Sequence, residues 1–358
     1  MANKASDSVA APGKQSRNER IEEFLREHYA FRYNTVKSRA EFRSNDGEFL
    51  PVTKYRLNSF RRELDRTIGI SISAENLRSM LESDFSERVN PVQAYFHKLP
   101  AATGTQAIDE LAATVTVRNA LHWPEYLTKW LVGVVANAMN DLGCQNHVCL
   151  VLTGEQGKFK TTWLDNLCPR SLASYLFTGK IDPQNKDVLT LVAEYLFINI
   201  DDQLKALNKR DENELKNLIT APSVKYRRPY DVYIEEYPHL ASFMASVNGN
   251  DFLTDPTGSR RFLPFEVLSI DIDQAIRVDM DRVYAEARTL LNNGFRYWFD
   301  DAEIEELHRG NVAFHVQTIE YEMLLKRFER RSKRIGGNPV YGWVIEKIVP
   351  NPFVSYGL

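Results

Sequence analysis

The sequence predicts an α/β fold in which helices cover a buried sheet. The first reason is a set of three short apolar runs, whose lengths favour strands over helices: residues 148–152, 195–200 and 241–247. Stretches with helical spacing of apolar residues separate these runs, as is typical of buried strands in α/β proteins. The second reason is the glycine-containing loop after the first run, which ends in a Lys-Thr pair. We therefore predict an α/β core from about residue 101 to 300.

The regions on either side of this core have different patterns. Residues 1–17 are rich in Ala, Ser, Lys, Pro and Gly, which is typical of a disordered tail. Residues 18–100 combine amphipathic helical patterns with a hairpin-like stretch that turns at Asn45-Asp46-Gly47, so we expect a small mixed α/β domain. The pattern over residues 301–358 predicts a helical C-terminal region, with no clear element beyond Gly336.

The composition excludes several classes of protein. The chain has 358 residues and a formal net charge of -3, so any nucleic-acid surface must be a local patch. No run approaches the ~20 apolar residues of a membrane span, and the first residues lack the apolar region of a signal peptide. We therefore expect a cytoplasmic protein without a membrane partner. Three cysteines fit a reducing compartment, and no ligand cluster completes a zinc site around them: Cys144, Cys149 and Cys168.

The loop after the first apolar run has the residues of a phosphate-binding site. Backbone N–H groups in such a loop point at phosphates, and the dipole of the following helix adds positive potential. We expect Lys160 to reach the β- and γ-phosphates of ATP, and the Thr161 hydroxyl to hold Mg²⁺. The alternative is an ordinary strand-to-helix turn. The residues predicted to bind the nucleotide are Gly154, Glu155, Gln156, Gly157, Lys158, Phe159, Lys160, Thr161 and Thr162.

Polar residues also follow the second and third apolar runs. Asp201 and Asp202 come directly after the second run, where we expect Asp201 to hold the metal and Asp202 to activate the attacking water. Asn248 follows the third run and would contact the γ-phosphate or that water. Each of these positions is also compatible with a plain turn, because Asp, Asn and Gly are common there.

Two groups of basic residues are candidates for contacts beyond the nucleotide. Arg260 and Arg261 follow a glycine turn and could supply an arginine finger to a neighbouring subunit, although a solvated turn is the alternative. A basic and aromatic cluster could bind phosphates and unpaired bases, or could be a solvated hairpin: Lys225, Tyr226, Arg227, Arg228 and Tyr230. A second basic run on or after a predicted helix has the same two interpretations: Lys326, Arg327, Arg330, Arg331, Lys333 and Arg334.

Several motifs taken together resemble the virulence-associated protein E family, which belongs with the superfamily 3 helicases and phage primase-helicases. The resemblance runs from about Asn90 to Trp298 and is fainter upstream. It depends on the combination and order of five segments: GEQGKFKTTW, INIDDQL, ELKNLITAPSVKYRRPY, ASFMASVN and DPTGSRRFLPFEV. It implies a P-loop NTPase core of the AAA+-like, superfamily 3 helicase type.

The resemblance also implies roles for matching residues. Gly154, Gly157, Lys160 and Thr161 fall on the Walker A loop, Asp201 and Asp202 on Walker B, Asn248 on a sensor, and Arg260 and Arg261 on the arginine finger. Residues 216–228, beginning with Lys216, fall on a segment that includes a pore-facing DNA contact in such helicases. Two departures stand out: Phe159 replaces an expected glycine, and His239-Leu240 replaces a basic pair found in many relatives.

These expectations favour an ATP- and Mg²⁺-dependent helicase or translocase of phage or mobile-element replication. It would act as a homo-oligomeric ring on single-stranded DNA, because an arginine finger in trans requires a neighbour. The main alternative is a nucleotide-dependent DNA-binding module with weak or no hydrolysis, which Phe159 would favour. A DNA-binding scaffold without nucleotide and a primase-helicase fragment are two further alternatives, and the first hundred residues show no acidic cluster of the primase kind.

Overall fold

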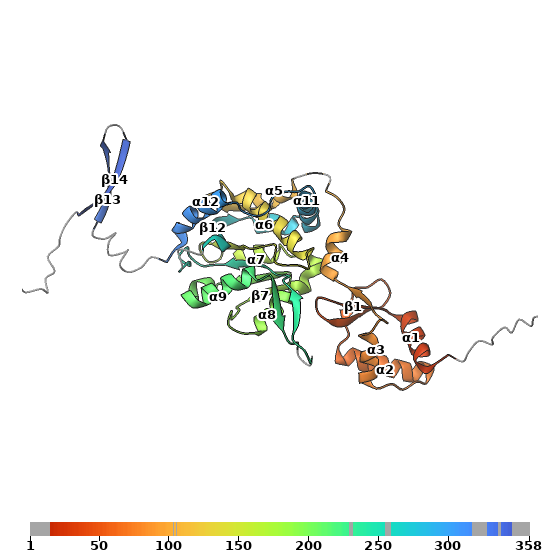
Figure 1. Ribbon diagram of the computed structural model, residues 1–358. Helices are drawn as coiled ribbons and strands as arrows, with labels where there is room; N and C mark the ends of the chain where they lie inside the picture. The colour runs from red at the N-terminus through yellow and green to blue at the C-terminus, as the bar shows by residue number, and fades with distance from the viewer. Residues whose placement is uncertain are drawn as a thin grey trace, which may run out of the picture.

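The computed structural model describes residues 15–102, 104, 106–228, 232–254, 259–316, 328–335 and 338–345. A small N-terminal domain lies beside a larger α/β domain, and the helix α4 (Pro91–Lys98) follows the small domain in the chain (Figure 1). Within these described residues, no helix has the length and apolar character required to cross a lipid bilayer.

The small domain is mixed α/β, as the sequence predicts. Its three helices are α1 (Arg17–His28), α2 (Lys54–Ile68) and α3 (Ala74–Leu81). Each helix begins after a Ser or Thr whose hydroxyl accepts a backbone N–H, which stabilises the first turn. The sheet has the order β3-β2-β1-β4, built from β1 (Ala30–Asn34), β2 (Arg39–Arg43), β3 (Leu50–Pro51) and β4 (Glu87–Val89).

The large domain contains one sheet of six strands in the order β5-β12-β6-β11-β8-β7. Every neighbouring pair is parallel except β5 and β12, which are antiparallel. The three predicted apolar runs form the central strands β6, β11 and β8, so the prediction of buried strands is confirmed. The bounds are β5 (Val115–Val117), β6 (Cys149–Thr153), β7 (Leu176–Gly179), β8 (Phe197–Asp201), β11 (Ser242–Ser246) and β12 (Phe262–Ile270).

Helices cover both faces of this sheet, which explains why its strands are apolar at successive positions. In β6, Leu150 and Leu152 pack into one apolar cluster, whereas Cys149 and Val151 pack into another on the opposite face. One face is covered by α5 (Ala107–Ala113), α6 (Trp123–Ala138) and α11 (Met280–Asn292), and the other by α8 (Asp187–Glu194) and α9 (Lys209–Thr220) (Figure 1). The helices α7 (Lys160–Asp165), α10 (Ile272–Arg277) and α12 (Asp301–Asn311) complete the domain.

The C-terminal region differs from the prediction of a helical tail. The helix α12 confirms the helical pattern that begins after residue 300, but residues 328–335 form the strand β13. This strand pairs antiparallel with β14 (Asn338–Ile345), where no element is expected. The sequence signal was present, because Gly336-Gly337 separates two stretches and the second is rich in Val, Tyr, Trp and Ile. The charged residues before the glycines concealed it, since Arg, Lys and Glu also favour helices.

Candidate functional site

The predicted phosphate loop connects the carboxyl end of β6 to the first residue of α7. Gly154 has φ of +122°, and a Cβ at this position would lie 2.8 Å from the backbone oxygen of Val267 on β12. Only glycine fits both the backbone conformation and this close approach. Gly154 also exchanges backbone hydrogen bonds with Gly249, at 3.4 and 3.0 Å. The start of the loop is therefore fixed between β12 and the turn that follows β11.

Phe159 has a left-handed backbone, with φ of +58°, immediately before α7. Its ring is 54% exposed, so the loop accommodates the missing glycine by turning the aromatic side chain toward solvent. The departure from the expected glycine therefore costs backbone strain, typically about 1–3 kcal/mol for a non-glycine residue in such a region. The ring itself does not fill the interior of the loop.

We expect Phe159→Gly to be at least as stable as the native chain, whereas Phe159→Val should be less stable by about 1–2 kcal/mol. Glycine relieves the left-handed strain and loses only an exposed ring, while a β-branched side chain increases the strain. Phe159→Ala, which retains a Cβ, should fall between the two. Thermal unfolding of the three variants measures this order, and a glycine variant that is the least stable would contradict it.

Lys160 is 5% exposed, and its ammonium group lies inside the curve of the loop. Its Nζ donates to the backbone oxygens of Gly154 at 3.1 Å and Glu155 at 2.6 Å, and to Oδ1 of Asn248 at 3.3 Å. Burial lowers the pKa of Lys160, and the nearby Asp202 carboxylate opposes that shift. The predicted lysine and the predicted sensor amide are therefore in direct contact.

Three side-chain oxygens meet beside this lysine at the ends of three elements. The hydroxyl of Thr161 on α7 donates to Oδ1 of Asp201 at 2.8 Å and lies 3.0 Å from the hydroxyl of Ser246. Ser246 donates to the same carboxylate oxygen at 2.8 Å, because β11 and β8 pair with Ser246 opposite Asp201. Hydroxyl and carboxylate oxygens are the ligands that Mg²⁺ prefers, so this donor set fits the predicted metal.

Asp202 lies just beyond this group of oxygens and is exposed. Its backbone is left-handed, with φ of +46°, and its N–H donates to the backbone oxygen of Ser246 at 3.0 Å. Its carboxylate accepts the N–H of Asn248 at 3.1 Å. The two predicted catalytic positions therefore hold each other in place at the edge of the phosphate loop.

Ser246 and Asn199 were missed as site residues by sequence reasoning. Asn199 is fully buried in β8, and its amide nitrogen donates to Asp165 at 2.8 Å, which ties the strand to α7. Both residues carry a signal that could have found them, namely a polar side chain inside an otherwise apolar buried strand. His239 is also buried, with its ring nitrogens within 2.9 Å of two backbone oxygens, and burial lowers its pKa to about 4.

Arg260 and Arg261 lie at the ends of the strands opposite to Lys160. They directly precede β12, whose first residue pairs with the first residue of β6, so they lie near the amino ends of both strands. Together with His147 and Trp298 they line a cavity of about 320 Å³. The structure therefore does not bring these arginines to the phosphate loop of their own chain.

The residues predicted to bind nucleic acid divide into exposed and buried groups. Lys225 and Arg227 are exposed at the hairpin of β9 (Ser223–Tyr226) and β10 (Glu235–Pro238). In contrast, Tyr226 is 8% exposed, and Lys216 is 2% exposed in an ion pair of 2.7 Å with Glu212. Tyr230, Lys326 and Arg327 lie outside the described residues, and Arg330, Arg331, Lys333 and Arg334 fall on β13.

Arg228 lies between the two domains, which corrects its interpretation as a surface contact. It is 9% exposed, lies 3.5 Å from Glu194, and donates to the backbone oxygen of Val36 in the small domain at 3.1 Å. Its guanidinium also lies over the ring of Tyr237, 4.2 Å from the centroid. Next to Val36, Lys37 lies over Tyr195, and burial lowers the pKa of Lys37 to about 8. Arg228 therefore anchors the base of the hairpin to the small domain.

A mostly parallel sheet with the loop, lysine, threonine and acidic strand end described above defines the P-loop class of α/β domains. A family model of the virulence-associated protein E-like domain matches residues 98–316. This span is more than half of the chain, so the protein belongs to the virulence-associated protein E-like domain family.

The solved structures similar to this chain include two of the NrS-1 C-terminal region. The apo structure of residues 305–718 shares 10% identity at a TM-score of 0.46, covering 91% of this chain and 98% of that chain. An A-form apo structure of the same region shares 12% identity at a TM-score of 0.43, with coverage of 91% and 98%. No curated protein matches the chain.

Proposed function

We propose that this protein is an ATPase that uses Mg²⁺ and couples hydrolysis to movement along single-stranded DNA. The observation that carries the proposal is the meeting of Lys160, Thr161 and Asp201 at one edge of the sheet. ATP and Mg²⁺ would supply the reactive phosphoanhydride and the charge that stabilises the leaving group. The residues of the chain then have separate tasks, each of which follows from its position.

Lys160 would hold the β- and γ-phosphates. In the structure its three hydrogen-bond acceptors are neutral oxygens, which phosphate oxygens can replace with stronger, charge-assisted bonds. Thr161, Asp201 and Ser246 would hold the metal through oxygen atoms. Asp202, which is exposed and accepts the N–H of Asn248, would accept a proton from an attacking water.

The hairpin of β9 and β10 is the surface that best suits DNA. Lys225 and Arg227 can neutralise phosphates, and Tyr233 near the tip is 75% exposed and can stack on an unpaired base. The hairpin lies in the chain between β8, which carries Asp201, and β11, which carries Ser246. The hairpin precedes the first residue of β11, so this strand connects the hairpin to Ser246 at its carboxyl end.

We expect DNA to stimulate ATP turnover, and Lys225→Ala with Arg227→Ala to weaken DNA binding in a salt-dependent way. Loss of two phosphate contacts should reduce the slope of log affinity against log salt by roughly 1.4, at about 0.7 per contact for single-stranded DNA. Arg228 is left unchanged because its alteration would disturb the domain contact. Fluorescence titration of labelled single-stranded DNA at several salt concentrations measures the slope.

The matched control is Lys209→Ala with Arg210→Ala, an exposed pair of the same composition at the start of α9. An unaltered slope in the hairpin variant would move the DNA contact elsewhere. Binding of ATP without turnover, with or without DNA, would identify the protein as a nucleotide-dependent binding module instead of an ATPase.

A further inference from the structure

The ring of Phe159 extends into solvent from a strained position in the phosphate loop. Its backbone is left-handed, with φ of +58°, a conformation that glycine would adopt without strain. The ring is 54% exposed and belongs to none of the apolar clusters in the described part of the chain. Strained positions gather at sites of binding and catalysis, where the strained residue has a task. An aromatic ring held in solvent at such a position therefore points to a contact with another molecule.

The cavity of about 320 Å³ beside Arg260 and Arg261 has walls that suit an aromatic ring. Three consecutive aromatic residues line it, Tyr297, Trp298 and Phe299, and Trp298 is 57% exposed. Guanidinium groups are attracted to the faces of aromatic rings, so the two arginines would add to the affinity for such a ring. The cavity therefore offers the stacking and cation–π contacts that an aromatic ring in solvent lacks.

One chain cannot place its own Phe159 in its own cavity. Phe159 lies in the loop that follows the carboxyl end of β6, whereas Arg260 and Arg261 lie near the amino ends of β6 and β12. The five residues of β6, at roughly 3.3 Å each, separate the two surfaces. Two copies can make the contact head to tail, because such an interface joins two different surfaces and repeats into a closed ring or a filament.

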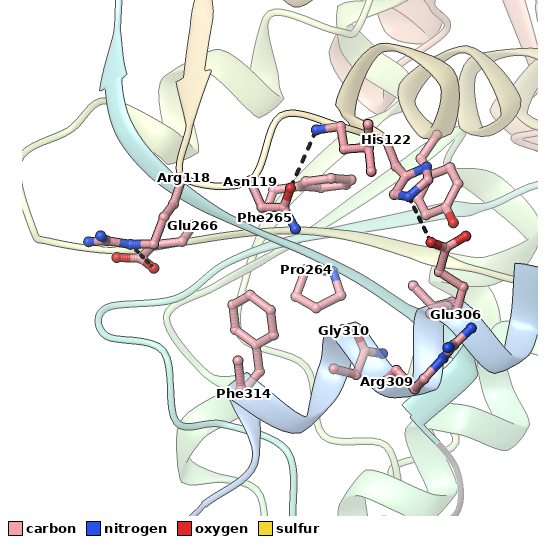
Figure 2. Close-up of a pocket in the computed structure, with 15 residues that line it drawn as sticks. Arg118, Asn119, His122, Pro264, Phe265, Glu266, Glu306, Arg309, Gly310 and Phe314 are labelled. Atoms are coloured by element: carbon pink, nitrogen blue, oxygen red, sulfur yellow. Dashed lines mark hydrogen bonds and ion pairs between the residues drawn. The ribbon is translucent and has the colours of Figure 1, made fainter. Parts of the chain in front are cut away.

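The charges of the two surfaces are complementary. On the loop, the side chain of Glu155 is 84% exposed with only a loose contact of 3.5 Å to Lys158, and Asp202 is also exposed. Two other carboxylates at this end of the sheet already have partners: Glu266 pairs with Arg118 at 2.6 Å (Figure 2), and Asp251 pairs with Lys205 at 2.8 Å. At the cavity, Arg260 is exposed and Arg261 has no acidic partner in the described part of the chain. The available acids of one copy can therefore face the arginines of the next.

We propose that the Phe159 ring of one copy of this protein binds in the aromatic cavity of a second copy, against Trp298 and beside Arg260 and Arg261. The inference goes beyond the proposed ATPase, because self-association and turnover can be measured separately. Phe159 directly precedes Lys160, so a bound ring would also bring the arginines of the second copy toward the phosphates that Lys160 would hold. Association of two copies and completion of the nucleotide site would then be one event.

Site-directed cross-linking tests which surfaces meet. Lys158→Cys places a thiol beside Phe159, and His147→Cys places one at the cavity, where His147 is exposed. The native cysteines of the described chain are all buried, so a short bis-maleimide should react mainly with the new thiols. A mixture of the two variants, one of them enlarged by a fusion tag, should give a cross-linked dimer with one copy of each. Either variant alone should not, whereas a chain with both substitutions should give a ladder of multimers.

Removal of either aromatic side chain should weaken this association. Phe159→Ala in the Lys158→Cys chain should lower the affinity between copies by roughly tenfold to a hundredfold, the usual effect of losing one large apolar side chain from an interface. Trp298→Ala in the His147→Cys chain should have a similar effect from the other surface. Tyr55→Ala is the control, because it removes an aromatic residue that is 84% exposed in the small domain, and it should change nothing. Sedimentation velocity over a range of protein concentrations measures the affinities, and thermal unfolding must show that each variant folds.

The outcomes separate this inference from the proposed function. Absence of the mixed dimer, with and without ATP and Mg²⁺, would overturn the inference, as would an association that Phe159→Ala and Trp298→Ala leave unchanged. Weaker DNA binding by Trp298→Ala with unaltered self-association would assign the cavity to an unpaired base and would also overturn it. ATP turnover without the cross-link would refute only the interface, whereas the cross-link without turnover would refute only the proposed function.

Discussion

Lys160→Ala is expected to reduce ATP turnover by roughly two to three orders of magnitude, the usual effect of losing one preorganised group that stabilises transition-state charge. Lys160 is the only lysine among the described residues whose ammonium group lies within 3.5 Å of the loop oxygens of both Gly154 and Glu155. Steady-state release of inorganic phosphate at saturating ATP and Mg²⁺ measures the effect.

The control for this prediction is Lys186→Ala, outside the phosphate loop. Lys186 is exposed directly before α8, so its removal should have a small effect. Because Lys160 is buried, thermal unfolding must show that Lys160→Ala still folds. Turnover within a factor of about two of the native value in a folded Lys160→Ala protein would refute the assignment of the loop.

Arg261→Ala should lower turnover by roughly a thousandfold or more if an arginine finger acts between subunits. Arg260 and Arg261 lie near the amino ends of β6 and β12, whereas their own phosphate loop follows the carboxyl end of β6. A finger at that position can serve only the nucleotide of a neighbour. Burial and the neighbouring Arg260 lower the pKa of Arg261, and no acidic residue in the described part of the chain forms an ion pair with it.

Mixing two inactive variants tests the arrangement. Subunits with Lys160→Ala retain their arginines, and subunits with Arg261→Ala retain their loops, so a mixed assembly would contain some complete sites if the finger acts between subunits. Turnover should rise well above that of either variant alone after subunit exchange, with the assembly monitored by light scattering. A mixture of Lys160→Ala with Arg277→Ala, an exposed arginine elsewhere, shows the activity of intact partners. No recovery in the first mixture would exclude a finger in trans.

The central strands and the loop could be predicted because their signals are local. A strand buried on both faces is a continuous apolar run, and a phosphate loop is contiguous from Gly154 to Thr161. The strand β12 was harder to predict because it contains Pro264. Proline has no N–H to donate to a neighbouring strand and is therefore uncommon in central strands. The structure resolves this, because β5 pairs with β12 only from Val267 to Ile270 and leaves the edge beside Pro264 free.

Which basic residues are exposed and which are buried could not be predicted, because contacts between distant parts of the sequence determine it. Lys225 and Arg228 are three positions apart and chemically similar, yet one is exposed and the other is buried. Arg228 differs because it donates to the backbone oxygen of Val36, which lies 192 positions before it in the sequence. No local sequence pattern indicates a hydrogen-bond partner at that distance along the chain. Similarly, the sequence places Arg261 after a turn but does not give the edge of the sheet on which that turn lies.

The contact of Arg228 with the small domain has a consequence for how the chain can be divided. A fragment that begins at Pro91 would retain the phosphate loop and the whole six-stranded sheet. It would also leave Arg228 and Glu194 facing water, and it would uncover Tyr175 and Tyr195, over which Lys37 lies. Val36 and Lys37 of the small domain thus shield the base of the hairpin, and we expect a fragment that lacks this domain to be less stable there.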